Sequence, residues 1–133
     1  MRISQRSYYG MLAMVFLAKN LGTNQLSEIA KAEHIPADFL EKILQQLKKA
    51  GLITSHKGVK GGYALAKPAK KITANDVIDA LEGSFAPFMC VSGKHQKNSC
   101  PREVSCVTKN VWQKLDATIS KTLQGMKLAD LIK

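Results

Sequence analysis

Residues 35–65, IPADFLEKILQQLKKAGLITSHKGVKGGYAL, predict a helix followed by two short strands. An apolar stripe with spacings of three and four runs along the helix: Phe39, Leu40, Ile43, Leu44 and Leu47. Gly51 should end the helix, and strands at 52–56 and 63–66 should flank a glycine-rich tip at 57–62. This order is typical of the recognition helix and wing of a winged helix-turn-helix unit, which binds DNA.

The segments around this stretch complete the expected unit. Residues 8–20 are apolar nearly all round and predict a helix buried on several sides. Ser27 is expected to cap a short helix over 28–33, and Pro36 to take the first position of the third helix. A capping box at 73–76 opens a further helix that Gly83 should end. Residues 1–83 are therefore expected to form a winged helix-turn-helix domain.

The rest of the chain divides into a loop and a long helix. Residues 84–103 lack helical periodicity, and residues 104–133 become regular again. A coiled-coil seam is expected at Val104, Thr108, Val111, Leu115, Thr118 and Thr122, on a helix of about 20 residues. A second copy of the chain would cover this seam, although packing against its own domain is the alternative. The expected fold is thus mostly α with a small β-wing and a C-terminal dimerisation helix.

The charge of the chain fits a nucleic-acid partner. The net charge is +10, and residues 1–71 carry 12 Lys/Arg against 4 Asp/Glu, whereas residues 72–133 carry 8 against 6. The cationic excess therefore accompanies the expected DNA-binding domain. The longest apolar run, 8–18, is too short to span a bilayer, and no secretory signal is visible, so a cytoplasmic protein without a membrane partner is expected.

Candidate DNA contacts lie on the third helix, on the wing and near the N-terminus. Asp38, Glu41, Lys42 and Gln45 have the spacing of a face that reaches base edges in the major groove. Lys57 and Lys60 place two cations on a tip whose glycines allow a close backbone approach. The remaining candidates are Arg2, Arg6, Ser27, Gly58, Gly61, Tyr63 and Lys67, and for Tyr63 packing is an equal alternative.

The segment FLEKILQQLKKAGLITSHKGVKGGYALAK closely resembles the Rrf-two family of bacterial winged-helix transcriptional regulators, whose IscR-, NsrR- and RirA-like members carry three cysteines and an iron–sulfur cluster. The resemblance extends from MRIS to the long helix after the cysteines. It implies that Glu41 and its neighbours read bases and that Lys57 enters the minor groove. The family usually has Arg at Lys57 and often Gln at Lys42, so a different operator is expected.

Cys90, Cys100 and Cys106 follow the pattern C-x9-C-x5-C. In a reducing compartment such thiols are expected to be metal ligands or redox groups rather than disulfides. The resemblance implies a 2Fe–2S or 4Fe–4S cluster, although the first gap is longer than in the family. The positions that supply a fourth ligand in relatives are Lys109 and Tyr8 here, so that ligand is unknown, with His95 and Glu103 as candidates.

Together these features predict a homodimeric regulator, with repression as its expected action, that binds a double-stranded DNA operator with an affinity set by the cluster. Two alternatives from the same family lack a cluster: control by cysteine oxidation, and control by a metabolite or partner protein. Zinc is another possible occupant of the cysteines. An iron–sulfur redox protein is a rival of another class, but the chain has no nucleotide-binding glycine motif and no nucleophile–base pair. An enzyme is therefore not expected.

Overall fold

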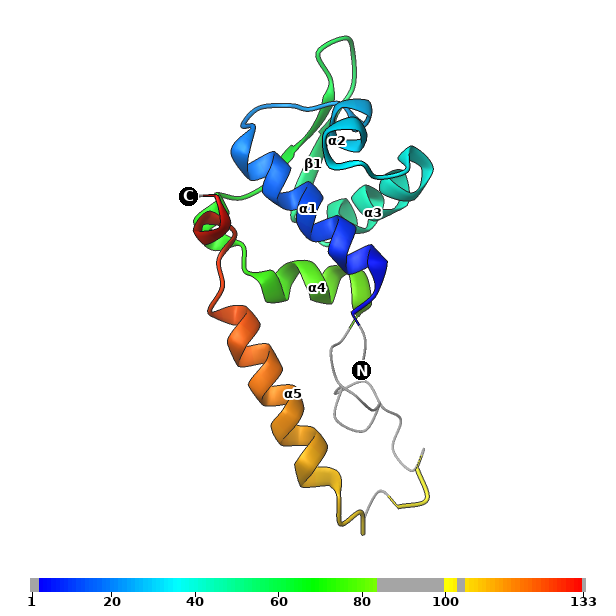
Figure 1. The fold of residues 1–133 in the computed structure, drawn as a ribbon, viewed down its shortest axis with the longest axis vertical. Helices are drawn as coiled ribbons and strands as arrows, with labels where there is room; N and C mark the ends of the chain where they lie inside the picture. The colour runs from blue at the N-terminus through cyan, green and yellow to red at the C-terminus, as the bar shows by residue number, and fades with distance from the viewer. Residues whose placement is uncertain (1–2, 84–99, 103–104, 133) are drawn as a thin grey trace.

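The structure is a computed structural model that describes residues 3–83, 100–102 and 105–132. Its elements follow in the order α1 (Gln5–Lys19), α2 (Leu26–Glu33), α3 (Ala37–Lys49), β1 (Ile53–His56), β2 (Gly62–Leu65), η1 (Ala69–Lys71), α4 (Ala74–Glu82), α5 (Lys109–Gln124) and η3 (Leu128–Leu131). Figure 1 shows a compact unit with the β-hairpin projecting at one end and α5 projecting at the other. The predicted fold class, mostly helical with a small β-wing, is confirmed.

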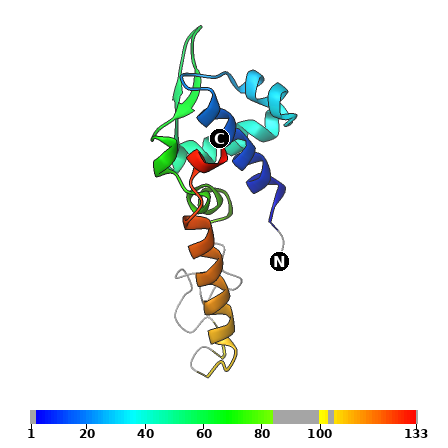
Figure 2. The ribbon, with the colours of Figure 1, turned by 60° about the vertical axis from the view of Figure 1, so that its left-hand side comes forward.

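One apolar core holds the compact unit together. The stripe predicted on α3 is its centre, because Leu40, Ile43, Leu44 and Leu47 are all buried. Residues of α1 and α4 pack against it, among them Met14 and Val77. Figure 2 shows the same arrangement after rotation, with α5 standing clear of this unit. The core therefore fixes the outward face of α3 without help from α5.

The helix-turn-helix is formed by α2 and α3. His34 ends α2 in the left-handed region, with φ 56° and ψ 45°. Its N–H donates to Ala30 O, and the N–H of Ile35 donates to the same carbonyl oxygen at 3.0 Å. This tight turn allows the apolar stripes of both helices to face the same core.

The wing is a two-stranded antiparallel ribbon. Ile53 pairs with Leu65 at its base and His56 with Gly62 near its tip. Asn24, in the connection between α1 and α2, extends the ribbon by exchanging two backbone hydrogen bonds with Tyr63, at 2.8 and 2.9 Å. The wing is therefore attached to the helical unit on the side of β2 as well as through β1.

The capping box predicted at 73–76 is confirmed: Thr73 Oγ1 accepts from the Asp76 N–H, and Asp76 Oδ2 accepts from the Thr73 N–H. The chain that follows α5 returns to the same place. The N–H of Ala74 donates to Met126 O, and the N–H of Leu128 donates to Ile72 O, both at 2.8 Å. These bonds fasten the C-terminal end of α5 to the start of α4.

Several predicted boundaries were wrong in detail. Ser27 does not cap α2, because the N–H groups of Glu28 and Ile29 both donate to Gln25 O and the helix begins at Leu26, two residues earlier than predicted. Pro36 is the N-cap of α3 rather than its first residue. Helix α5 begins at Lys109, since none of residues 105–108 is helical, and it has 16 residues rather than about 20. The first strand begins one residue later than predicted and the second strand one residue earlier, and the first helix begins at Gln5 rather than at residue 8.

Candidate nucleic-acid interface and cysteine region

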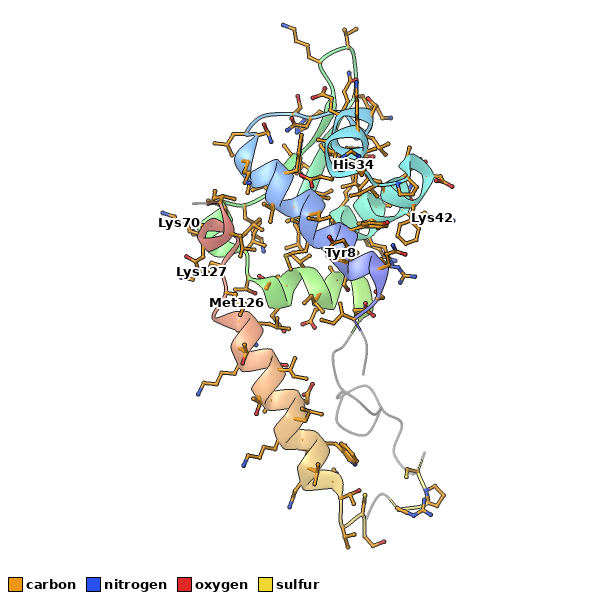
Figure 3. All side chains as sticks on the ribbon, viewed as in Figure 1. Tyr8, His34, Lys42, Lys70, Met126 and Lys127 are labelled. Carbon is orange, nitrogen blue, oxygen red and sulfur yellow. The ribbon has the colours of Figure 1, made fainter. Side chains whose placement is uncertain are left out.

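Helix α3 presents the predicted base-reading side chains to solvent. Asp38, Glu41, Lys42 and Gln45 are all exposed on the face opposite the buried stripe. None of them forms a side-chain hydrogen bond or ion pair with another residue that the structure describes. Figure 3 shows Lys42 at the outer edge of α3, directed away from the core. The buried stripe thus fixes α3 in the core, while the side chains of its exposed face are free to contact a partner.

The tip of the wing carries the two predicted cations. Lys57 and Lys60 are exposed, and Val59 between them is 95% exposed. Gly58 has φ 108°, which few other residues adopt. Gly61 is buried, and a Cβ there would collide with the carbonyl of His56. Both glycines are therefore required for the shape of the tip.

Three residues before α2 hold the wing, and the sequence did not single them out. Thr23 Oγ1 donates to Lys60 O at 2.8 Å, and Gln25 Nε2 donates to Val59 O at 3.5 Å. With the backbone pairing of Asn24, these bonds position the tip relative to the helix-turn-helix. A polar run in an α1–α2 connection has no periodicity, so no local pattern could have identified this role.

The N-terminal candidates differ in their surroundings. Arg6 is exposed at the start of α1, and its Nη1 donates to Leu81 O at the end of α4 at 3.3 Å. Arg2 lies outside the described residues. Ser27 is exposed on α2, and Lys67 is exposed after β2. The side chain of Tyr63 is partly buried against the core, and its backbone pairs with Asn24. The structure therefore gives Tyr63 a packing role.

The beginning of α1 and the end of α4 are also joined through a carboxylate. Glu82 accepts hydrogen bonds from the Ser4 N–H, from the Ser4 hydroxyl and from the Ser7 hydroxyl. The hydrogen bond from Ser4 Oγ is the largest cause that lowers the pKa of Glu82. The other serine hydrogen bonds and the charge of Arg6 also lower this pKa, whereas partial burial raises it. Glu82 is the penultimate residue before the segment that carries Cys90 begins at residue 84.

Two of the three cysteines lie in the described part of the chain. Cys100 and Cys106 are free thiols of intermediate exposure, while Cys90, His95 and Glu103 lie outside the described residues. Cys106 Sγ lies 3.3 Å from the Thr108 hydroxyl, just before α5. This hydrogen bond, with the backbone N–H groups of Thr108 and Lys109, lowers the pKa of the Cys106 thiol. Such a lowered pKa favours the thiolate, which is the form that binds metals.

The donor chemistry of this region fits a soft metal centre. Among the described residues, no three His, Cys, Asp or Glu side chains gather into a metal site. Cys100 and Cys106 are partly exposed, and thiolates are the usual ligands of iron–sulfur clusters. The described residues therefore include two of the three cysteines that are predicted to be ligands.

A family model described as "Rrf2: Iron-dependent Transcriptional regulator" matches residues 3–133. The chain is 35% identical to Protein rrf2 of Nitratidesulfovibrio vulgaris over 136 residues, covering 100% of this chain and 88% of that protein. Among solved structures, T. potens IscR aligns with a TM-score of 0.78 and 33% identity, covering 99% of this chain and 86% of that one. CymR, titled the global cysteine regulator of B. subtilis, aligns with a TM-score of 0.77 and 29% identity, covering 99% and 96%. None of the described helices has the length and apolar content needed to cross a bilayer. The chain belongs to the Rrf2 family of helix-turn-helix transcriptional regulators and is not an enzyme.

Proposed function

We propose that the protein is a homodimeric repressor that binds operator DNA through α3 and the wing, with an affinity set by an iron–sulfur cluster on Cys90, Cys100 and Cys106. The observation that carries the DNA-binding part is the unpaired polar face of α3 beside a wing tip with two exposed lysines. Glu41 and Gln45 would read bases, and Lys57 would enter the minor groove.

Helix α5 supports the dimer. It contains no buried residue, and Val111 is 57% and Leu115 is 36% exposed. The partly buried residues of α5 share a neighbouring face instead: Lys109, Trp112, Asp116, Ile119, Ser120 and Leu123. The predicted seam is thus exposed from Thr108 to Thr122, Val104 lying outside the described residues, while another face is partly buried. A second copy of the chain would cover the exposed seam.

A physical route connects the cysteine region to the DNA-binding face. An iron–sulfur cluster, when bound, supplies a centre that is sensitive to oxidants, nitric oxide and iron supply. The cysteine segment starts directly after α4, whose last turn holds Ser4, the N-cap of α1, and Arg6 and Ser7 of α1. A displacement of this turn would therefore move the start of α1 relative to α3. Operator and cluster binding must then affect each other reciprocally.

The decisive experiment is anaerobic purification followed by iron and sulfide analysis, a visible spectrum and DNA selection from a random-sequence library. We expect matching iron and sulfide, lost in Cys100→Ala and Cys106→Ala but retained in the neighbouring control Ser105→Ala. The selected DNA should bind with different affinities to the protein with the cluster and to the protein without it. Absence of iron after anaerobic reconstitution would contradict the cluster.

The second candidate is regulation by the cysteines without a cluster. The lowered pKa of Cys106 favours it, because thiolates are the form that oxidants attack. The similarity to Staphylococcus aureus CymR, whose solved structure is titled an oxidized form (31% identity, TM-score 0.73), points the same way. This candidate predicts metal-free protein whose DNA binding responds to peroxide and recovers with a thiol reductant, and whose response disappears in Cys106→Ser.

A further inference from the structure

A cationic hollow of about 470 Å³ lies between the start of α1 and α3. Three cations line it: Arg6 from α1, and Lys42 and Lys49 from α3. Gln45 and Gln46 add two side-chain amides, and two apolar side chains of α3 complete the lining. Among the residues that the structure describes, no Asp or Glu belongs to the lining. The hollow therefore combines positive charge with hydrogen-bond donors, as an oxyanion requires.

The cations are placed by elements rather than by flexible loops. Lys42 and Lys49 are seven residues apart, or about two helical turns, so they project from the same side of α3. Arg6 is held by its bond to Leu81 O. A guanidinium has five N–H donors, so this one bond leaves the others available. Three cations from two packed helices thus line the same hollow.

The hollow borders the face of α3 that is proposed to read bases. Gln45 belongs to both, and Asp38 projects from the same exposed face as Lys42. A helix in the major groove lies between two phosphate backbones, and proteins contact these phosphates to fix their position on the duplex. A hollow beside the reading face is therefore where a backbone phosphate would lie.

We propose that this hollow is a phosphate-binding site formed by Arg6, Lys42 and Lys49, and that its ligand is a phosphate of the DNA backbone; this rests on the proposed function. Free inorganic phosphate has the same chemistry and is the other source to be tested. In this arrangement Lys42 binds phosphate instead of guanine. Recognition of bases is then left to Asp38, Glu41 and Gln45.

Lys48 and Lys49 provide a matched pair for the test. Both are exposed lysines in the last turn of α3, but only Lys49 lines the hollow. Binding of the full-length protein to a mixed-sequence duplex is measured against salt concentration for Lys49→Gln and Lys48→Gln. We expect the slope of log Kobs against log salt to fall by about 0.9 in Lys49→Gln, the value for one phosphate contact, and to stay unchanged in Lys48→Gln. Equal slopes in the two variants would overturn the DNA assignment.

The second arm uses inorganic phosphate without DNA. Phosphate is titrated at constant ionic strength, and the amide resonances of residues 6, 42 and 49 are followed by NMR. Saturable shifts that Lys49→Gln abolishes would show that free phosphate occupies the same site. Absence of shifts, together with the slope difference, would assign the site to DNA alone.

The two arms also separate failure of this inference from failure of the proposed function. If the wild-type protein binds no DNA, the proposed function fails, and the phosphate titration alone decides whether the hollow binds an oxyanion. If the protein binds DNA but Lys49→Gln behaves like Lys48→Gln and phosphate causes no shifts, only the inference fails. Thermal unfolding of both variants should match the wild type, because the side chains are exposed.

Discussion

The hydroxyl of Ser7 donates to the carboxylate of Glu82 across 75 residues of sequence, with an Oγ–Oε1 distance of 2.7 Å. Ser7 is 2% exposed, so its hydroxyl has little access to water if this acceptor is lost. The bond joins the first helix, which carries Arg6, to the last turn before the cysteine segment. It therefore couples two parts of the protein that the proposed function requires to communicate.

Glu82→Ala should destabilise the fold, because it leaves the buried Ser7 hydroxyl without its acceptor. Loss of a partner for a buried donor costs about 1–3 kcal/mol. Urea unfolding of the wild type, Ser7→Ala, Glu82→Ala and the double variant measures the coupling. We expect the two single effects to be non-additive by at least about 0.5 kcal/mol. Additive effects would show that the bond contributes nothing to stability.

The carboxylate of Glu82 also predicts a pH dependence of stability. The pKa of Glu82 is lowered in the folded protein, chiefly by the hydrogen bond from the Ser4 hydroxyl. A carboxyl with a lowered folded pKa stabilises the fold above its unfolded pKa, about 4.3, and this contribution is lost as the pH falls through the folded value. The free energies of unfolding of wild type and Glu82→Gln should therefore differ at pH 6 and converge at the acidic end. A difference that grows on acidification would contradict this sign.

The wing depends on one glycine in particular. A Cβ at Gly62 would collide with the backbone carbonyl of Asn24, and its φ of 147° is unfavourable for other residues. Gly62→Ala should displace β2 from Asn24, weaken DNA binding and cost about 1–3 kcal/mol of stability. Gly58→Ala is the control, because it also has a positive φ of 108° but nothing within 4 Å of its Cβ. Equal losses in both variants would assign the effect to backbone conformation alone.

The wing lysine should contribute through charge. Lys57→Gln is expected to lower the salt slope of DNA binding by about 0.9 and to weaken binding most at low salt. Lys70→Gln is the control, since Lys70 is also exposed but lies on the opposite side of the molecule from Lys42 in Figure 3. An unchanged slope in Lys57→Gln would remove the wing from the contact surface.

Local patterns in the sequence were sufficient for the elements but not for their connections. The stripe on α3 and the capping box of α4 depend on neighbours within one helix, and both predictions were confirmed. The support of the wing by Thr23 and the pairing of Glu82 with Ser7 join residues 37 and 75 positions apart. The hollow likewise needs the packing of α1 on α3 before Arg6 and Lys49 meet. No periodicity encodes such contacts, so a single sequence could not predict them.

The open face of α5 predicts the assembly state. Leu115 lies in the exposed seam with Val111, and a charge there would have to be desolvated if a second copy covers it. Leu115→Glu should therefore shift the protein from dimer to monomer in sedimentation velocity at micromolar concentration. Gln113→Glu is the matched control, because Gln113 is exposed on the same helix about 160° away from Leu115 at 100° per residue. DNA binding should weaken in Leu115→Glu even though α3 and the wing are unchanged, since two linked half-site contacts become one. A wild-type monomer, or a Leu115→Glu dimer, would show that this seam is not the interface.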